Sequence, residues 1–335
     1  MKRLQRIWLV FGMAVAAVMG AMVWVTVLGL QLEGSHGRAR RQAALEERVR
    51  LALWRMDSAL AALLARENSR PYFTYNPFYP QNRAYTRMFS PIEPGEVLVP
   101  SRLLTFDSPY VRLYFQILPE GDMTSPQVPT GNMRDLAESY YLSPEAIERA
   151  ERQLAELQAG VDREAVVRAV TSREGREEAS AGLAGAKPEN TRSRQNRQTL
   201  RNMAALRARG RQVQQSIAQN SPATMRMESP GDLREGPLEA AWADGHLLLT
   251  RPVQANGDLY VQGCWMDWQA VRNWLLGEIE DLLPNARLVR TGQSEGPEDY
   301  RLLASLPARL VPGEVALPDG GSLYPVRLSL VVAWM

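Results

Sequence analysis

An apolar run without any charged residue extends from Ile7 to Leu30, directly after a basic N-terminus that contains Lys2, Arg3 and Arg6. A helix crosses a bilayer with roughly 20 apolar residues, so the run predicts an N-terminal transmembrane helix. Basic residues favour the cytoplasmic side, which places the N-terminus in the cytoplasm and the main domain outside it. A cleaved signal peptide is the alternative interpretation, because such peptides also carry a basic start before an apolar core.

The pattern then changes to that of an amphipathic helix from Arg38 to Glu67. Apolar residues recur at steps of three and four, which gathers them on one helical face. This face predicts packing on the helix's own domain or a membrane-proximal signalling or dimer helix, and both can hold together. The apolar positions are Leu45, Val49, Leu53 or Met56, Leu60, Leu63 and Leu64.

Beyond this helix, short runs rich in β-branched and aromatic residues predict strands. The dipeptide Asn256-Gly257 separates two of these runs and predicts an antiparallel hairpin. The predicted strands cover residues 96–105, 110–118, 246–253, 259–265, 286–290 and 302–311.

Two further regions have helical periodicity. The first covers about 134–169 and contains Ser143-Pro144, a typical N-cap followed by proline at the first helical position. The second covers 268–282 and is preceded by the capping residue Asp267.

Two segments remain open to more than one interpretation. Thr171–Ser221 is rich in Arg, Gln, Asn, Glu and Ser, and predicts a solvated helical or disordered insertion, with contact to an anionic lipid or polymer as the alternative. Val326–Met335 is apolar except for Arg327, and predicts the start of a second transmembrane helix or a last β-strand.

These patterns predict an α+β chain whose mixed domain has an antiparallel sheet. A cytoplasmic tip and anchor occupy residues 1–34, and the membrane-proximal helix occupies 35–70. The extracytoplasmic domain follows at 71–325 with its insertion at about 171–221, and 326–335 begins the second membrane helix.

Composition narrows the chemistry. The single cysteine, Cys264, cannot form an intrachain disulfide, and the two histidines, His36 and His246, are too few for most zinc or iron sites. No nucleophile elbow, phosphate loop or H-E-x-x-H motif occurs. We therefore predict no catalytic residues, metal or cofactor. Enzyme activity stays uncertain, because the carboxylate pair of an envelope hydrolase is recognised only in space.

A candidate ligand pocket is suggested by aromatics gathered in the proline-containing segment 70–80, RPYFTYNPFYP. We predict a pocket on a face of the sheet for a small anionic or aromatic ligand, although packing at the edge of a core explains the same aromatics. The predicted ligand-binding residues are Tyr72, Phe73, Tyr75, Arg251 and Trp265.

The stretch HLLLTRPVQANGDLYVQGCWMDWQAVRNWLL resembles the late segment of extracytoplasmic PAS-like sensor domains of the Cache type. In those domains a strand, a glycine turn and a second strand ending in an acidic residue lead into a helix. The corresponding positions here are Leu247–Val253, Gly257, Tyr260–Trp265, Asp267 and Ala270–Leu276. The whole arrangement is similar to the sensory half of membrane-bound, planctomycete-type sensor histidine kinases.

This resemblance implies the extracytoplasmic signal-sensing part of a two-component system at the inner (cytoplasmic) membrane, which passes ligand-induced helix displacement across that membrane. The implied partners are an unknown small-molecule or envelope ligand and a second copy of the chain in a homodimer. Neither His36 nor His246 fits a phospho-accepting histidine, so a response regulator is implied only if a kinase core follows.

If the chain continues, it is expected to be a protein histidine kinase; no nucleic-acid partner is expected. The alternative is a membrane-anchored envelope scaffolding protein, in which the Arg/Gln-rich segment contacts partners and no pocket is used.

Overall fold

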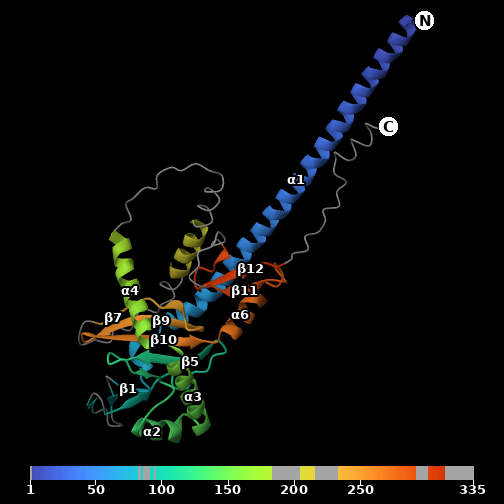
Figure 1. Cartoon of the computed structure of the whole chain (residues 1–335). Helices are drawn as coiled ribbons and strands as arrows, with labels where there is room; N and C mark the ends of the chain where they lie inside the picture. Colours follow the sequence, from blue (N-terminus) through green and yellow to red (C-terminus); the bar gives the residue numbers. More distant parts are fainter. Residues whose placement is uncertain are drawn as a thin grey trace.

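The computed structural model describes residues 2–81, 84–85, 91–93, 96–182, 204–215, 233–291 and 301–313. It confirms an α+β fold with antiparallel sheets. A six-stranded sheet lies at the centre, and helices from distant parts of the chain pack on both of its faces (Figure 1).

The central sheet has the strand order β6-β5-β10-β9-β7, and β8 also pairs with β9. All of its pairings are antiparallel. Its first strand in the chain, β5, therefore lies beside its last, β10, in the middle of the sheet. The strands are β5 (Val111–Ile117), β6 (Met123–Thr124), β7 (Arg234–Glu235), β8 (Glu239–Ala243), β9 (His246–Ala255) and β10 (Asp258–Met266).

Two tight turns join the last three of these strands. Asn256 and Gly257 have φ values of 55° and 90°, and they connect β9 to β10 with Ala255 opposite Asp258. A two-residue turn with both φ values positive matches the twist of an antiparallel pair. The predicted hairpin is thus confirmed. Asp244 and Gly245 form a similar turn between β8 and β9, with φ values of 47° and 88°.

The helix α1 runs without interruption from Lys2 to Asn68 (Figure 1). Its C-terminal part packs against one face of the central sheet and contributes buried side chains to the largest core cluster. This confirms the amphipathic helix predicted for Arg38–Glu67. The buried positions include Val49, Leu53, Met56, Leu60, Leu63 and Leu64.

The predicted N-terminal transmembrane helix is not supported. In the part of the chain that the structure describes, no helix has a stretch both long and apolar enough to cross a membrane. The uncharged run Ile7–Leu30 forms part of the continuous helix α1. The predicted start of a second transmembrane helix at 326–335 lies outside the described residues.

Three helices replace the single helical region predicted around 134–169. They are α2 (Asn132–Tyr140), α3 (Pro144–Gly160) and α4 (Arg163–Gly182). The Ser143 side chain accepts a hydrogen bond from the Ala146 amide, and Asp162 accepts one from the Ala165 amide. These caps satisfy amide groups that a helix start leaves unpaired, so the chain begins a new helix at each of them.

The remaining elements are short. Helix α6 (Trp268–Gly277) begins at the predicted cap, where the Asp267 carboxylate accepts from the Ala270 amide. The strand predicted at 96–105 is shorter than expected. The other elements are η1 (Tyr72–Tyr75), β1 (Phe78–Pro80), β2 (Ala84–Tyr85), β3 (Pro91–Ile92), β4 (Leu98–Pro100), β11 (Arg287–Arg290), β12 (Ala308–Val311) and a helix at residues 204–215.

Candidate functional site

The two faces of the central sheet separate the predicted ligand-binding residues. Arg251 lies opposite Gln262 in the β9–β10 pair, and Trp265 lies three residues further along β10. Because successive side chains of a strand alternate between faces, Arg251 and Trp265 point to opposite sides. Arg251 bonds to the end of α1, whereas Trp265 packs in the core cluster with α3 and α4.

Arg251 is 1% exposed and ties the end of α1 to the sheet. Its guanidinium donates to the carbonyls of Asn68 and Arg70 at 3.3 and 2.6 Å, and to the Gln262 side chain at 3.1 Å. The last carbonyls of a helix have no partner within the helix, so these bonds cap α1. Arg251 is therefore committed to holding the fold together.

The aromatic residues predicted for the pocket pack around Arg251 and its hydrogen bonds. Tyr75 is buried, with the Arg251 guanidinium 5.8 Å from its ring centre. The Tyr72 carbonyl accepts from Gln262 at 2.8 Å, while the Phe73 ring packs on Tyr79 with centroids 4.7 Å apart. The structure thus brings Tyr72, Tyr75 and Arg251 together as a packed, hydrogen-bonded unit.

A second buried polar cluster, formed by Glu67, Arg70 and Tyr114, lies at the same end of α1. Arg70 bonds to the Glu67 carboxylate at 2.5 and 3.1 Å, and the Tyr114 hydroxyl donates to it at 2.9 Å. Removal from water raises the pKa of Tyr114 well above its usual range, and the nearby Cys264 and Glu67 raise it further. Each partner is fixed by another, so this cluster sets where α1 ends against the sheet.

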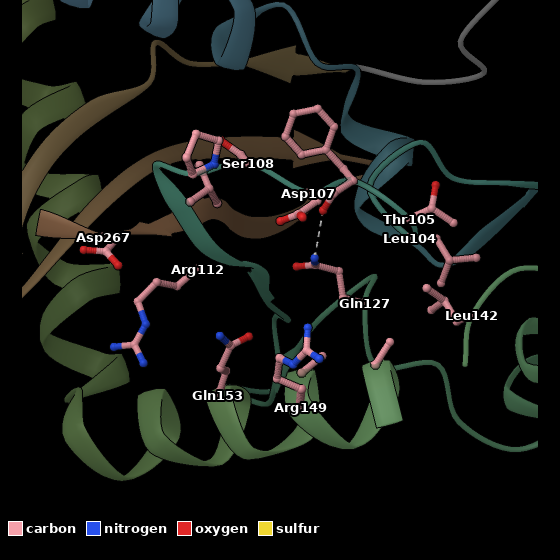
Figure 2. A pocket seen from close by; sticks show the side chains of 15 residues that line it. Leu104, Thr105, Asp107, Ser108, Arg112, Gln127, Leu142, Arg149, Gln153 and Asp267 are labelled. Carbon is pink, nitrogen blue, oxygen red and sulfur yellow. Dashed lines mark hydrogen bonds between the residues drawn. The ribbon is translucent and has the colours of Figure 1, made fainter. Parts of the chain in front are cut away.

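A cavity of about 410 Å³ lies on the other side of β5, between α3 and the segment 104–112 (Figure 2). Its lining is mixed in charge and mostly polar. The polar groups in the wall of a ligand pocket fix the orientation of the ligand and select it. The polar side chains that matter most are Asp107, Arg112, Gln127, Arg149, Gln153 and Asp267.

One face of α3 forms the floor of this cavity, through Ala146, Arg149, Ala150 and Gln153. The spacing of three and four residues aligns them along one side of the helix. The two alanines leave room, and the Arg149 and Gln153 side chains reach toward the cavity (Figure 2). Neither has a hydrogen-bond or ion-pair partner among the residues that the structure describes, so both are available to a ligand.

Arg112 lines the same cavity from β5, and its guanidinium stacks on the Trp265 ring. The Arg112 guanidinium lies 3.9 Å from the centre of the Trp265 ring, and it also meets Glu156 at 3.4 Å. Stacking on an indole leaves the N–H edge of a guanidinium accessible, and here that edge bonds to the Glu156 carboxylate at 3.4 and 3.5 Å. Trp265, predicted to touch a ligand, therefore lies behind a side chain that lines the cavity.

Gln127 and Phe106 belong both to the cavity wall and to the surroundings of the Glu67 cluster. The Gln127 side chain accepts from the Tyr114 amide at 3.0 Å. It donates to the Phe106 carbonyl at 3.3 Å, the bond drawn as a dashed line in Figure 2. The Arg70 guanidinium lies 4.3 Å from the centre of the Phe106 ring. Two residues of the cavity thus contact the groups that fix the end of α1.

A second connection runs through Asp267, which lines the cavity and caps α6. Just beyond the C-terminal end of α6, the Glu278 carbonyl and the Asp281 carboxylate accept from Arg55 of α1 at 2.9 and 2.6 Å. The cavity therefore contacts α1 directly at one end and through α6 at another.

Metal binding finds no support in the described ranges, where no group of three or more His, Cys, Asp or Glu side chains is placed to hold an ion. Comparisons with protein-family models, curated proteins and solved structures give no match to this chain. The resemblance to Cache-type sensor domains accordingly stays a prediction. What the geometry defines is an α+β domain with a polar cavity joined to a long helix.

Proposed function

We propose that this chain is the signal-sensing part of a sensor of the histidine-kinase type, in which the cavity binds a small anionic ligand and α1 reports its presence. The kinase core is not among its residues, so the proposal concerns sensing alone. A sensor needs a binding site and an element whose position depends on it, because a ligand shifts an equilibrium only by binding two states differently.

The observation that carries the proposal is the double role of Gln127 and Phe106. A ligand that displaces Gln127 also disturbs the Tyr114 amide, and one that moves Phe106 disturbs its contact with Arg70. Both contacts lead to the cluster that ends α1. Binding and helix position are therefore linked through packed and hydrogen-bonded groups.

The fold adds support. The strand, glycine turn, strand and helix expected of Cache-type domains occur as β9, Gly257, β10 and α6.

The ligand class follows from the donors in the cavity wall. Arg149 and Gln153 have no partner among the described residues and offer N–H groups that suit a carboxylate or phosphate group, while Arg112 is already paired with Glu156. Asp107 and Asp267 line the same cavity and disfavour an anion that fills it entirely. A small solute with one anionic group at the Arg149 side fits this arrangement.

Thermal unfolding of the full chain with small carboxylates, inorganic phosphate and phosphate esters tests the proposal. We expect at least one of them to raise Tm in a concentration-dependent way, because a ligand that binds the native state stabilises it. Arg149→Ala is expected to abolish the shift. Arg152→Ala is the matched control, since Arg152 is exposed on the same helix and does not line the cavity. No shift with any of these anions, or a full shift in Arg149→Ala, would contradict it.

A protein-interaction module is the second candidate, and exposed aromatic residues at the end of α2 favour it. Tyr140 and Tyr141 are 75% and 43% exposed, and Met133 of the same helix is 38% exposed. Exposed apolar groups of this kind are common where a protein partner binds. Substitution of Tyr140 and Tyr141 would then abolish partner capture, with no effect of small anions on Tm.

Dimer formation stays a prediction. The transmembrane anchor is not supported, so localisation at the membrane also stays a prediction.

A further inference from the structure

The helix at residues 204–215 is attached to α1 by a buried ion pair. Arg209 bonds to Asp57 at 2.7 Å, and the two side chains are only 10% and 3% exposed. Arg209 belongs to the Arg/Gln-rich segment, for which a solvated helix or a disordered insertion was expected. This arginine is instead removed from water against the C-terminal part of the long helix.

Three distant parts of the chain meet at this pair. The Arg209 guanidinium also donates to the Leu302 carbonyl at 3.1 Å. The second oxygen of Asp57 accepts from the Ala304 amide at 2.9 Å and from the Ser305 hydroxyl at 3.3 Å. Arg209 can therefore bond to both Asp57 and Leu302 only while α1 and the 301–313 segment keep their present relative positions.

Most side chains of this helix are exposed, and Val213 is its one buried side chain among residues 204–215. A helix of this length is marginal by itself in water, so its presence depends on what it packs against. Burial raises the pKa of the Asp57 carboxyl, although Arg209 and the two donors act in the opposite direction. The ionised carboxylate thus depends on Arg209 being in place.

We propose that the helix 204–215 is a releasable strap, docked on α1 by Arg209 and freed as a unit when α1 moves relative to the 301–313 segment. Its docking state follows the position of α1. None of the Arg209 contacts involves a residue of the cavity, so the docking of the strap is tested separately from ligand binding. Loss of the Arg209 contacts removes both its ionic attachment and its link to Leu302, while the central sheet is untouched.

Hydrogen exchange on the full chain tests the strap. Arg209→Met is expected to speed exchange of the amides in 204–215 at least tenfold and to leave β9 and β10 unchanged. Arg207→Met is the matched control, because Arg207 is exposed on the same helix and should leave every rate as in the wild type. Unchanged protection of 204–215 in Arg209→Met, or faster exchange throughout the sheet, would overturn the proposal.

The unmodified protein provides a second test that does not depend on a variant folding. In low concentrations of denaturant, a strap opens locally, so its amides exchange at rates that hardly change with denaturant. The amides of β9 and β10 should instead follow global unfolding. If the 204–215 amides exchange only together with those strands, the helix is a fixed part of the core and the strap is refuted.

Discussion

Buried polar side chains hold the end of α1 to the sheet, and nearly all of their hydrogen-bonding groups are paired. Gln262 donates to Gln116 at 2.8 Å and accepts from Arg251, which in turn caps α1. A buried polar group that loses its partner keeps its desolvation cost, so such networks are sensitive to single substitutions. Single substitutions of these residues therefore test the contribution of each one to the network.

Gln127→Ala is expected to lower the free energy of unfolding by about 1–3 kcal/mol, because the Tyr114 amide and the Phe106 carbonyl lose their partner. Gln153→Ala serves as its control. Gln153 lines the same cavity without a described partner, and its loss is expected to cost less than about 0.5 kcal/mol. Urea unfolding measures both, and equal losses would show that Gln127 has no special role.

The buried phenol of Tyr114 allows a prediction of how the stability of the fold changes at alkaline pH. Burial raises the pKa of its phenol above the ordinary value of 10.0, so the unfolded chain loses this proton at a lower pH than the folded one. The contribution to stability is therefore full below about pH 10 and is lost as the pH rises further.

Tyr114→Phe is expected to reduce the loss of stability measured by urea unfolding between about pH 9 and 11, whatever its cost at neutral pH. Tyr140→Phe, at an exposed position, is the control and should leave the curve unchanged. A wild-type slope retained in Tyr114→Phe would count against the buried cluster.

The sequence contained the information that separates Arg251 from Trp265. The Asn256-Gly257 turn fixes the register of the hairpin and places Arg251 opposite Gln262. Gln262 and Trp265 are an odd number of residues apart and face opposite sides. In contrast, the Arg112–Trp265 stack forms between the paired strands β5 and β10. The residue pattern of one strand does not reveal which other strand lies beside it.

Elements with strong local signals were predictable. The caps at Ser143 and Asp267, and the glycine turn at Gly257, gave helices and a hairpin near their observed positions. Strand β8 was missed, although Asp244-Gly245 is the same kind of turn signal. The cavity also had a local signal: alanine alternates with polar residues along Ala146, Arg149, Ala150 and Gln153 of α3.

Strand β10 depends on Gly263 for its close contact with β9. A Cβ atom there would lie 2.1 Å from the Leu249 carbonyl oxygen, which belongs to the sheet backbone and cannot rotate away. Gly263→Ala is expected to cost about 3 kcal/mol or more of unfolding free energy in urea. Gly277→Ala, at the end of α6 with no atom within 4 Å of the new Cβ, should be tolerated. Similar stability of the two variants would contradict this sheet geometry.

The arrangement of the whole molecule could not be predicted from local patterns. Glu67 meets Tyr114, Asp57 meets Arg209 and Arg55 meets Asp281, each across a long stretch of chain. Such contacts arise only when the layers assemble around the sheet. The transmembrane prediction rested on one run of residues in isolation, and it is not supported because no helix in the described part of the chain is long and apolar enough to cross a membrane.

The central claim is that an occupied cavity changes the end of α1. Hydrogen exchange along residues 49–67 tests it most directly, with and without the anion that shifts Tm most. We predict a change of exchange in the last turns of α1 in the wild type, and its loss in Gln127→Ala, where the link to Tyr114 is missing. If the anion protects the cavity walls while exchange along α1 stays the same, the cavity binds a ligand without signalling through this helix, and the account is wrong.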